Sequence, residues 1–222
     1  MADYGLEVFN SNNGLQIDSK YRNFSYQDSG SLSISVGLNT INFVDTDEVP
    51  IIAIQPSTAT YCMLHTLNKS GGDFITASIW GERLASGTIN WMSFIEGTVI
   101  TLPTYGLLVY DSSGTVVFSS EDRHMKIVDV YTGTCAKSGT SDETVSNANN
   151  NYFILYPQSY WIEEVFIPPV PKTIGIHHGL GLKKIDSTTI RVGDFLFYLE
   201  DPLVNGGDLW HSGNYTLIEV SN

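Results

Sequence analysis

The chain has 222 residues, of which 42% are hydrophobic and 16% charged, so it is long and apolar enough to bury a sizeable core. Its 24 acidic residues against 11 lysines and arginines give a formal net charge of −13, which disfavours binding to nucleic acids and anionic membrane surfaces. The sequence contains no run of about 18 apolar residues, and its N-terminus lacks the basic and apolar regions of a signal peptide. We therefore expect a protein without a membrane span that is made in a cytoplasm.

The chain opens on a pattern that predicts a β-hairpin. Residues 4–11 read Tyr-Gly-Leu-Glu-Val-Phe-Asn-Ser, so Leu6 and Val8 fall on one face of a first strand. Gly14 tolerates positive φ and is expected at the turn before the chain returns. Arg22 follows the return strand, where it either holds a carboxylate or carbonyl of a loop or is simply solvated.

Alternating apolar and polar residues predict most of the remaining strands. In residues 32–38 every apolar side chain falls on one face, whereas residues 51–54 and 195–199 are continuously apolar, which is typical of strands covered on both faces. Further strands are expected at 75–80, 88–95 and 215–220. Helical periodicity is poor, and Gly- and Asn-containing turns recur at short intervals. We therefore predict an all-β fold that is β-sandwich-like or barrel-like.

The opening hairpin pattern recurs later in the chain. Tyr4 returns as Tyr105, an offset of 101 residues that holds without a gap through Arg22 and Arg123, although the turn glycine sits one place earlier in the second copy. The motif residues are Tyr4, Gly5, Leu6, Val8, Gly14 and Arg22 in the first copy and Tyr105, Gly106, Leu107, Val109, Gly114 and Arg123 in the second. This repeat predicts two tandem small β domains, residues 1–103 and 104–222, each opened by a similar hairpin. The alternative is one larger fold that uses two equivalent hairpins.

Two segments differ from the strand pattern. Residues 138–151 are rich in Ser, Thr and Asn and contain almost nothing to bury, so we expect a mobile loop. Residues 167–171 contain three prolines, which predict a stiff, extended spacer.

The residue types that carry enzyme chemistry do not form a recognisable motif. Cys62 and Cys135 stand in unrelated contexts and are expected to be buried free thiols, although a disulfide stays open. His177 and His178 are neighbours in a predicted strand, where they point to opposite faces and are poorly placed to share a metal. We therefore predict no catalytic residue, no metal site and no cofactor, and a protein that is not an enzyme.

Two aromatic pairs deserve separate consideration. Tyr160 with Trp161, and Trp210 with His211, have the ring surfaces that stack on sugars and the polar edges that hydrogen-bond to them. The alternative is that these aromatic side chains belong to the core or to a subunit interface.

The repeated pattern Tyr-Gly-Leu-x-Val-aromatic-Asn/Asp-Ser, followed by Gly and then Ile/Phe-x-Ser-x-x-Arg, resembles a signature of small β-rich tail-associated proteins of tailed bacteriophages. Residues 4–22 and 105–123 carry the resemblance, which covers less than a fifth of the chain. It implies a structural component of the virion tail (tail tip, baseplate or fibre-associated) that forms a symmetric homo-oligomer and docks on other phage tail proteins. The group lends no catalytic residue. The alternative function is a lectin-like, carbohydrate-binding module that recognises a host surface glycan.

Overall fold

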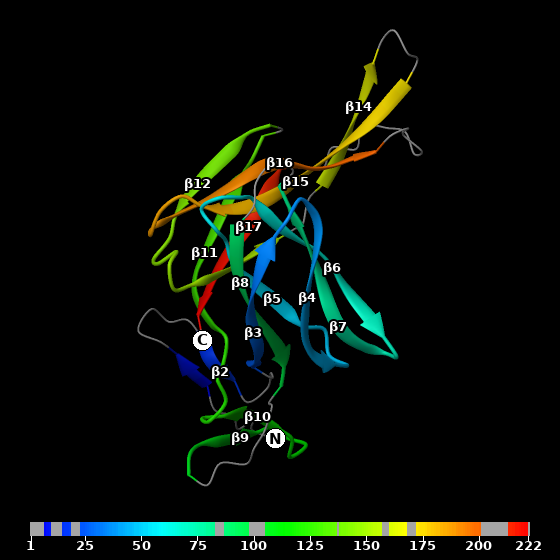
Figure 1. Ribbon diagram of the computed structural model, residues 1–222. Helices are drawn as coiled ribbons and strands as arrows, with labels where there is room; N and C mark the ends of the chain where they lie inside the picture. The colour runs from blue at the N-terminus through cyan, green and yellow to red at the C-terminus, as the bar shows by residue number, and fades with distance from the viewer. Residues whose placement is uncertain are drawn as a thin grey trace.

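The computed structural model of the chain describes residues 7–9, 15–18, 23–82, 87–97, 105–136, 138–156, 160–167, 172–200 and 213–221. These residues form β-strands and turns, and two large antiparallel sheets pack face to face (Figure 1), so the predicted all-β, β-sandwich-like fold is confirmed. The strands are β1 (Glu7–Phe9), β2 (Leu15–Asp18), β3 (Phe24–Ile34), β4 (Gly37–Thr46), β5 (Ile51–Gln55), β6 (Cys62–Ser70), β7 (Asp73–Gly81), β8 (Gly87–Glu96), β9 (Leu108–Tyr110), β10 (Val116–Ser119), β11 (Lys126–Thr134), β12 (Thr140–Thr144), β13 (Tyr152–Tyr156), β14 (Tyr160–Ile167), β15 (Lys172–Lys184), β16 (Thr189–Glu200) and β17 (Asn214–Ser221). The described part of the chain holds no helix long and apolar enough to cross a bilayer.

Each half of the chain contributes three adjacent strands to each large sheet. The six-stranded sheet has the order β11-β17-β13-β5-β8-β3, and the other has the order β12-β16-β15-β6-β7-β4 with β14 added beside β15. If β14 is left out, the strands β3 to β8 can be matched in chain order with β11 to β17. The two strands of each matched pair then lie equally far from the centre of the same sheet, one on each side. The fold is therefore a six-strand unit used twice, and both sheets run continuously through the two copies. The boundary at residues 103 and 104 lies outside the described residues and stays a prediction.

The register of the strands repeats with the spacing of the hairpin motif. β3 pairs with β8 with an irregularity between Tyr26 and Asp28, and β11 pairs with β17 with the same irregularity between Ile127 and Asp129. The burial pattern of β17 also repeats that of β8 from residue 88 to residue 95, position for position. The duplication therefore extends well beyond the hairpins that the sequence identifies.

Apolar side chains fill both faces of the central strands. Ile52 and Ile54 belong to the core between the two sheets, whereas Ala53 lies with Phe94 and Val220 in a separate cluster on the other face. This confirms that residues 51–54 form a strand covered on both sides. Each half also has its own core cluster between the sheets, as expected for a duplicated unit.

Both predicted hairpins are present. Val8 lies opposite Ile17 in the first, and Val109 lies opposite Phe118 in the second, with the register shifting at the same position in each. Figure 1 places both hairpins at the end of the molecule opposite β14. Gly114 has a φ of 83°, as its turn position requires, while Gly14 lies outside the described residues.

The segment expected to be a mobile loop is instead structured. Residues 140–144 form β12, an edge strand that pairs with β16 from Thr144↔Thr189 to Thr140↔Gly193. Val145 and Ala148 are buried in the core of the second half. None of the side chains of β12 is buried, so this edge strand of Thr, Ser, Asp and Glu needs no apolar pattern. Pro168, Pro169 and Pro171 lie outside the described residues, so the spacer stays a prediction.

Candidate functional site

The described structure includes only one of the two aromatic pairs proposed from the sequence. Tyr160 and Trp161 begin β14, where their backbones lie opposite Gly179 and His178 of β15. Trp210 and His211 lie outside the described residues. The idea that these four residues form a sugar-stacking surface therefore stays a prediction.

The second hairpin exposes much of its motif. Tyr105 is 87% exposed and Leu107 is 47% exposed, whereas Val109 is buried under the hairpin. The guanidinium of Arg123 lies 4.3 Å from the ring centroid of Tyr26. The sequence predicted that this arginine holds a loop carboxylate or carbonyl or is simply solvated, and the structure adds a cation–π contact that neither alternative included. The residues Tyr4, Gly5, Leu6 and Arg22 of the first copy lie outside the described residues.

The segments that follow the two hairpins meet at the edges of the six-stranded sheet. Ser25 and His124 form an antiparallel bridge, which joins the start of β3 to the segment before β11. The backbone amide of Tyr26 donates to the carbonyl of Arg123 at 2.6 Å, and that of Met125 donates to Phe24 at 2.8 Å. Both edges of the sheet thus meet beside the hairpins. Phe24 and Met125 from these two segments pack against the cluster around Phe94.

A cysteine, a histidine and an aspartate lie near one another in the second half, but their contacts are structural. His178 Nδ1 lies 3.0 Å from Asp194 Oδ1, and Asp194 Oδ2 accepts a hydrogen bond from the Ser138 amide at 2.6 Å. The Cys135 thiol donates to the Gly139 carbonyl at 3.1 Å. Burial raises the pKa of Cys135, which keeps it a thiol rather than a nucleophilic thiolate. The trio fixes the turn before β12 onto β16. Among the described residues, no group of three or more His, Cys, Asp or Glu is placed to hold a metal.

Glu219 is a fully buried carboxylate that the sequence analysis did not single out. Its Oε1 accepts hydrogen bonds from Ser146 Oγ at 2.6 Å, from the Asn147 amide at 3.1 Å and from Asn151 Nδ2 at 2.6 Å. Its Oε2 accepts from Tyr131 Oη at 2.8 Å and from the Ser146 amide at 3.0 Å. Burial alone raises the pKa of Glu219, but the hydrogen bonds from Asn151, Ser146 and Tyr131 outweigh it and hold the pKa below its usual value. The carboxylate therefore anchors residues 146–151 to β17.

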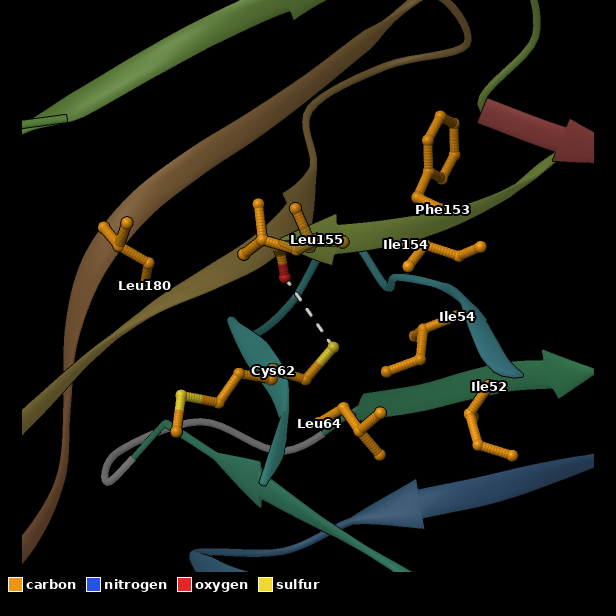
Figure 2. Close-up of a pocket in the computed structure, with 10 residues that line it drawn as sticks. Ile52, Ile54, Cys62, Leu64, Phe153, Ile154, Leu155 and Leu180 are labelled. Atoms are coloured by element: carbon orange, nitrogen blue, oxygen red, sulfur yellow. Dashed lines mark hydrogen bonds between the residues drawn. The ribbon is translucent and has the colours of Figure 1, made fainter. Parts of the chain in front are cut away.

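A small cavity lies where the two half-cores meet (Figure 2). Side chains from β5, β6, β13 and β15 surround it, and its volume is about 30 Å³. The Cys62 thiol lies 3.7 Å from the Leu182 carbonyl at its edge, and burial raises the pKa of Cys62 to about 12. A dry apolar space of this size is a packing gap and not a ligand site. The lining residues are Ile52, Ile54, Cys62, Met63, Leu64, Phe153, Ile154, Leu155, Leu180 and Leu182.

An open groove lies on the other face of the six-stranded sheet in the second half. Its volume is about 500 Å³, within the range of small-molecule sites. Thr216 of β17 lies directly opposite Tyr156 of β13 on one side and Thr132 of β11 on the other. Tyr156 is 68% exposed. The lining residues are Thr132, Gly133, Thr134, Tyr156, Asn214, Tyr215 and Thr216. Sequence reasoning missed this set because its members come from three strands far apart in the chain.

Comparison with family models, with curated proteins and with solved structures finds no match to this chain. The described residues and their chemistry are therefore the basis for the function proposed below.

Proposed function

We propose that the protein is a structural component of a bacteriophage tail, in the tail tip, the baseplate or a fibre-associated position. It acts by forming a symmetric homo-oligomer and docking on other tail proteins. The observation that carries this proposal is the twice-used hairpin whose motif resembles the tail-associated group. Both copies form hairpins of the same register at one end of the molecule.

The exposed surface of the second hairpin supports a docking role. Tyr105 and Leu107 together place a large aromatic and an aliphatic side chain in solvent just before β9, the first strand of a small two-stranded sheet. Exposed apolar groups of this kind are stabilised when a partner covers them. The bridge between Ser25 and His124 fixes this hairpin to the body, so it presents a defined surface.

Light scattering on the purified protein tests self-assembly, and co-purification with the tail proteins encoded beside it tests docking. We expect a single symmetric oligomer and capture of at least one tail protein. Leu107→Asp should weaken capture, whereas Leu38→Asp, which alters an equally exposed leucine on β4, should not. A strict monomer that captures no tail protein would contradict the proposal.

A second candidate function is carbohydrate binding at a cell surface. The observation that favours it is the open groove around Tyr156, where an exposed aromatic ring lies beside hydroxyl and amide groups. The two functions are compatible, because a tail protein can also bind a host glycan. A glycan array probed with the purified protein tests this candidate, and an array blank at high protein concentration would remove it.

A further inference from the structure

The duplicated fold allows the groove to be compared with its own counterpart in the first half. The spacing of 101 residues matches Thr132 to Ser31 and Tyr156 to Gln55. The matched burial patterns of β8 and β17 place Asn90 at the position of Thr216. The pairing agrees, because Asn90 lies opposite both Ser31 and Gln55. Each half therefore has a row of three polar residues on three neighbouring strands, Ser31, Asn90 and Gln55 in the first half and Thr132, Thr216 and Tyr156 in the second.

In the first half the side chains of this row hydrogen-bond to one another. Ser31 Oγ donates to Asn90 Oδ1 at 2.6 Å, and Asn90 Nδ2 donates to Gln55 Oε1 at 2.7 Å. Gln55 Nε2 then donates to the carbonyl of Asn149 at 2.5 Å. Asn149 belongs to residues 146–151, the segment that Glu219 anchors, so this segment contacts the row. The side-chain hydrogen-bonding groups of this copy are largely used within the protein.

In the second half the equivalent row is open. Within the described part of the chain, the side chains of Thr132, Thr216 and Tyr156 make no hydrogen bond to protein groups. Thr134 Oγ1 donates to Asn214 Oδ1 at 2.8 Å, which fixes the Asn214 amide at the end of the groove. The two copies thus share a backbone arrangement, and among the described residues the second copy has hydroxyls without a protein partner beside an exposed aromatic ring.

We propose that this groove is the binding site for a neutral saccharide. A sugar ring has an apolar C–H face that packs against an aromatic ring and equatorial hydroxyls that both donate and accept hydrogen bonds. Tyr156 supplies the ring, while Thr132, Thr216 and Asn214 supply hydroxyl and amide partners. None of the described residues that line the groove is charged, and the chain carries a net charge of −13, so an anionic sugar is disfavoured. This inference rests on the second proposed function, carbohydrate binding, and is independent of the tail role.

Saturation-transfer difference NMR with a panel of neutral saccharides tests the assignment. The panel contains galactose, glucose, mannose, rhamnose, N-acetylglucosamine and their oligosaccharides, with N-acetylneuraminic acid as the anionic comparison. We expect transfer to at least one neutral saccharide and none to N-acetylneuraminic acid. Tyr156→Ala should weaken binding roughly tenfold, and Thr216→Val should weaken it about threefold to tenfold.

Tyr110→Ala is the matched control, because Tyr110 is a half-exposed tyrosine on β9, outside the groove. It should bind like the unaltered protein, and circular dichroism should show that all three variants are folded. Binding by the unaltered protein that Tyr156→Ala leaves intact would overturn the groove assignment while keeping carbohydrate binding. Transfer to N-acetylneuraminic acid alone would overturn the neutral-saccharide assignment, and no transfer to any saccharide of the panel at millimolar concentration would overturn carbohydrate binding as well.

Discussion

Asp28 and Asp129 lie 101 residues apart in the chain and make the same contact at the same irregularity of the six-stranded sheet. Each carboxylate accepts a hydrogen bond from the backbone amide of the following residue at 2.8 Å, just after its strand shifts register. A short polar side chain that bonds its own backbone is well suited to a bulge. Since this detail is kept in both halves, the two halves are copies of one unit whose closing strands meet at Ser25 and His124.

The bridge between the two hairpin ends should contribute measurably to stability. Ser25 is fully buried, and its hydroxyl donates to the Gly97 carbonyl at 2.5 Å and lies 3.3 Å from His124 Nδ1. Ser25→Val removes both contacts, so it should lower the free energy of unfolding by about 1–3 kcal/mol. Urea denaturation measures this, with the exposed Ser33→Val on the same strand as control. Equal stability of the two variants would show that the side-chain contacts of Ser25 contribute little.

Glu219 should be the most sensitive carboxylate in the second half. Glu219→Gln replaces an acceptor oxygen with a donor that faces the amides and hydroxyls around it. We expect a loss of about 2–4 kcal/mol at neutral pH, because buried donors are left without a partner. The exposed Glu121→Gln should change stability little. A Glu219→Gln variant as stable as the parent would mean that residues 146–151 are held by other contacts.

The same residue predicts a pH dependence with a defined sign. The pKa of Glu219 is lowered in the folded protein, so its charged form stabilises the fold above the unfolded pKa of about 4.3. That contribution is lost as the pH falls through the folded pKa. The difference in unfolding free energy between the parent and Glu219→Gln should therefore be largest near pH 7 and shrink below about pH 4. A difference that stays constant from pH 7 to pH 3 would contradict the lowered pKa.

The backbone conformation at position 114 should be the reason that a glycine is needed there. Its φ is 83°, and a Cβ added there would meet no atom within 4 Å, so any cost of substitution comes from strain and not from a clash. Gly114→Val should lower the free energy of unfolding by about 1–2 kcal/mol, and Gly114→Asn should cost less because Asn tolerates positive φ. A thermal melt in which the valine variant matches the parent would place the turn elsewhere.

Both thiols should be unreactive in the folded protein. Cys62 and Cys135 are free and buried, and burial raises the pKa of each, that of Cys62 to about 12. At pH 8 a thiol reagent should therefore label neither quickly in the native state and both after denaturation. Rapid labelling of one thiol per chain in the native protein would show that Cys62 or Cys135 is accessible to solvent.

The sequence predicted most individual strands and missed how they assemble. The alternation in residues 32–38 was misleading, because β3 ends at Ile34 and β4 begins at Gly37, which leaves Val36 and Leu38 exposed. The hairpins around Val8 and Val109 follow from alternation and turn glycines, and both are present. The partners of β5 and β13 could not be predicted, because period-two alternation marks a strand without naming its neighbour. The rest of the duplication was also hidden, since the second copy adds β14 and the offset between equivalent residues changes after it.

The buried carboxylate and the groove were missed for a related reason. Glu219 reads as an ordinary polar residue between Ile218 and Val220, and its donors lie about 70 residues earlier in the chain. Tyr156 is a single tyrosine at a strand end, and the threonines beside it come from two other strands. In the sequence, the chosen aromatic pairs come shortly after β13 and shortly before β17, but only the sheet pairing reveals which side chains share a face.

Mass spectrometry of purified virions, from a phage whose genome encodes this chain, tests the central proposal most directly. If the protein is a tail component, its peptides should be present at a fixed copy number per particle, and tails separated from heads should retain them. Absence of these peptides from purified virions, with the protein found only in the lysed cell fraction, would contradict the proposed tail function.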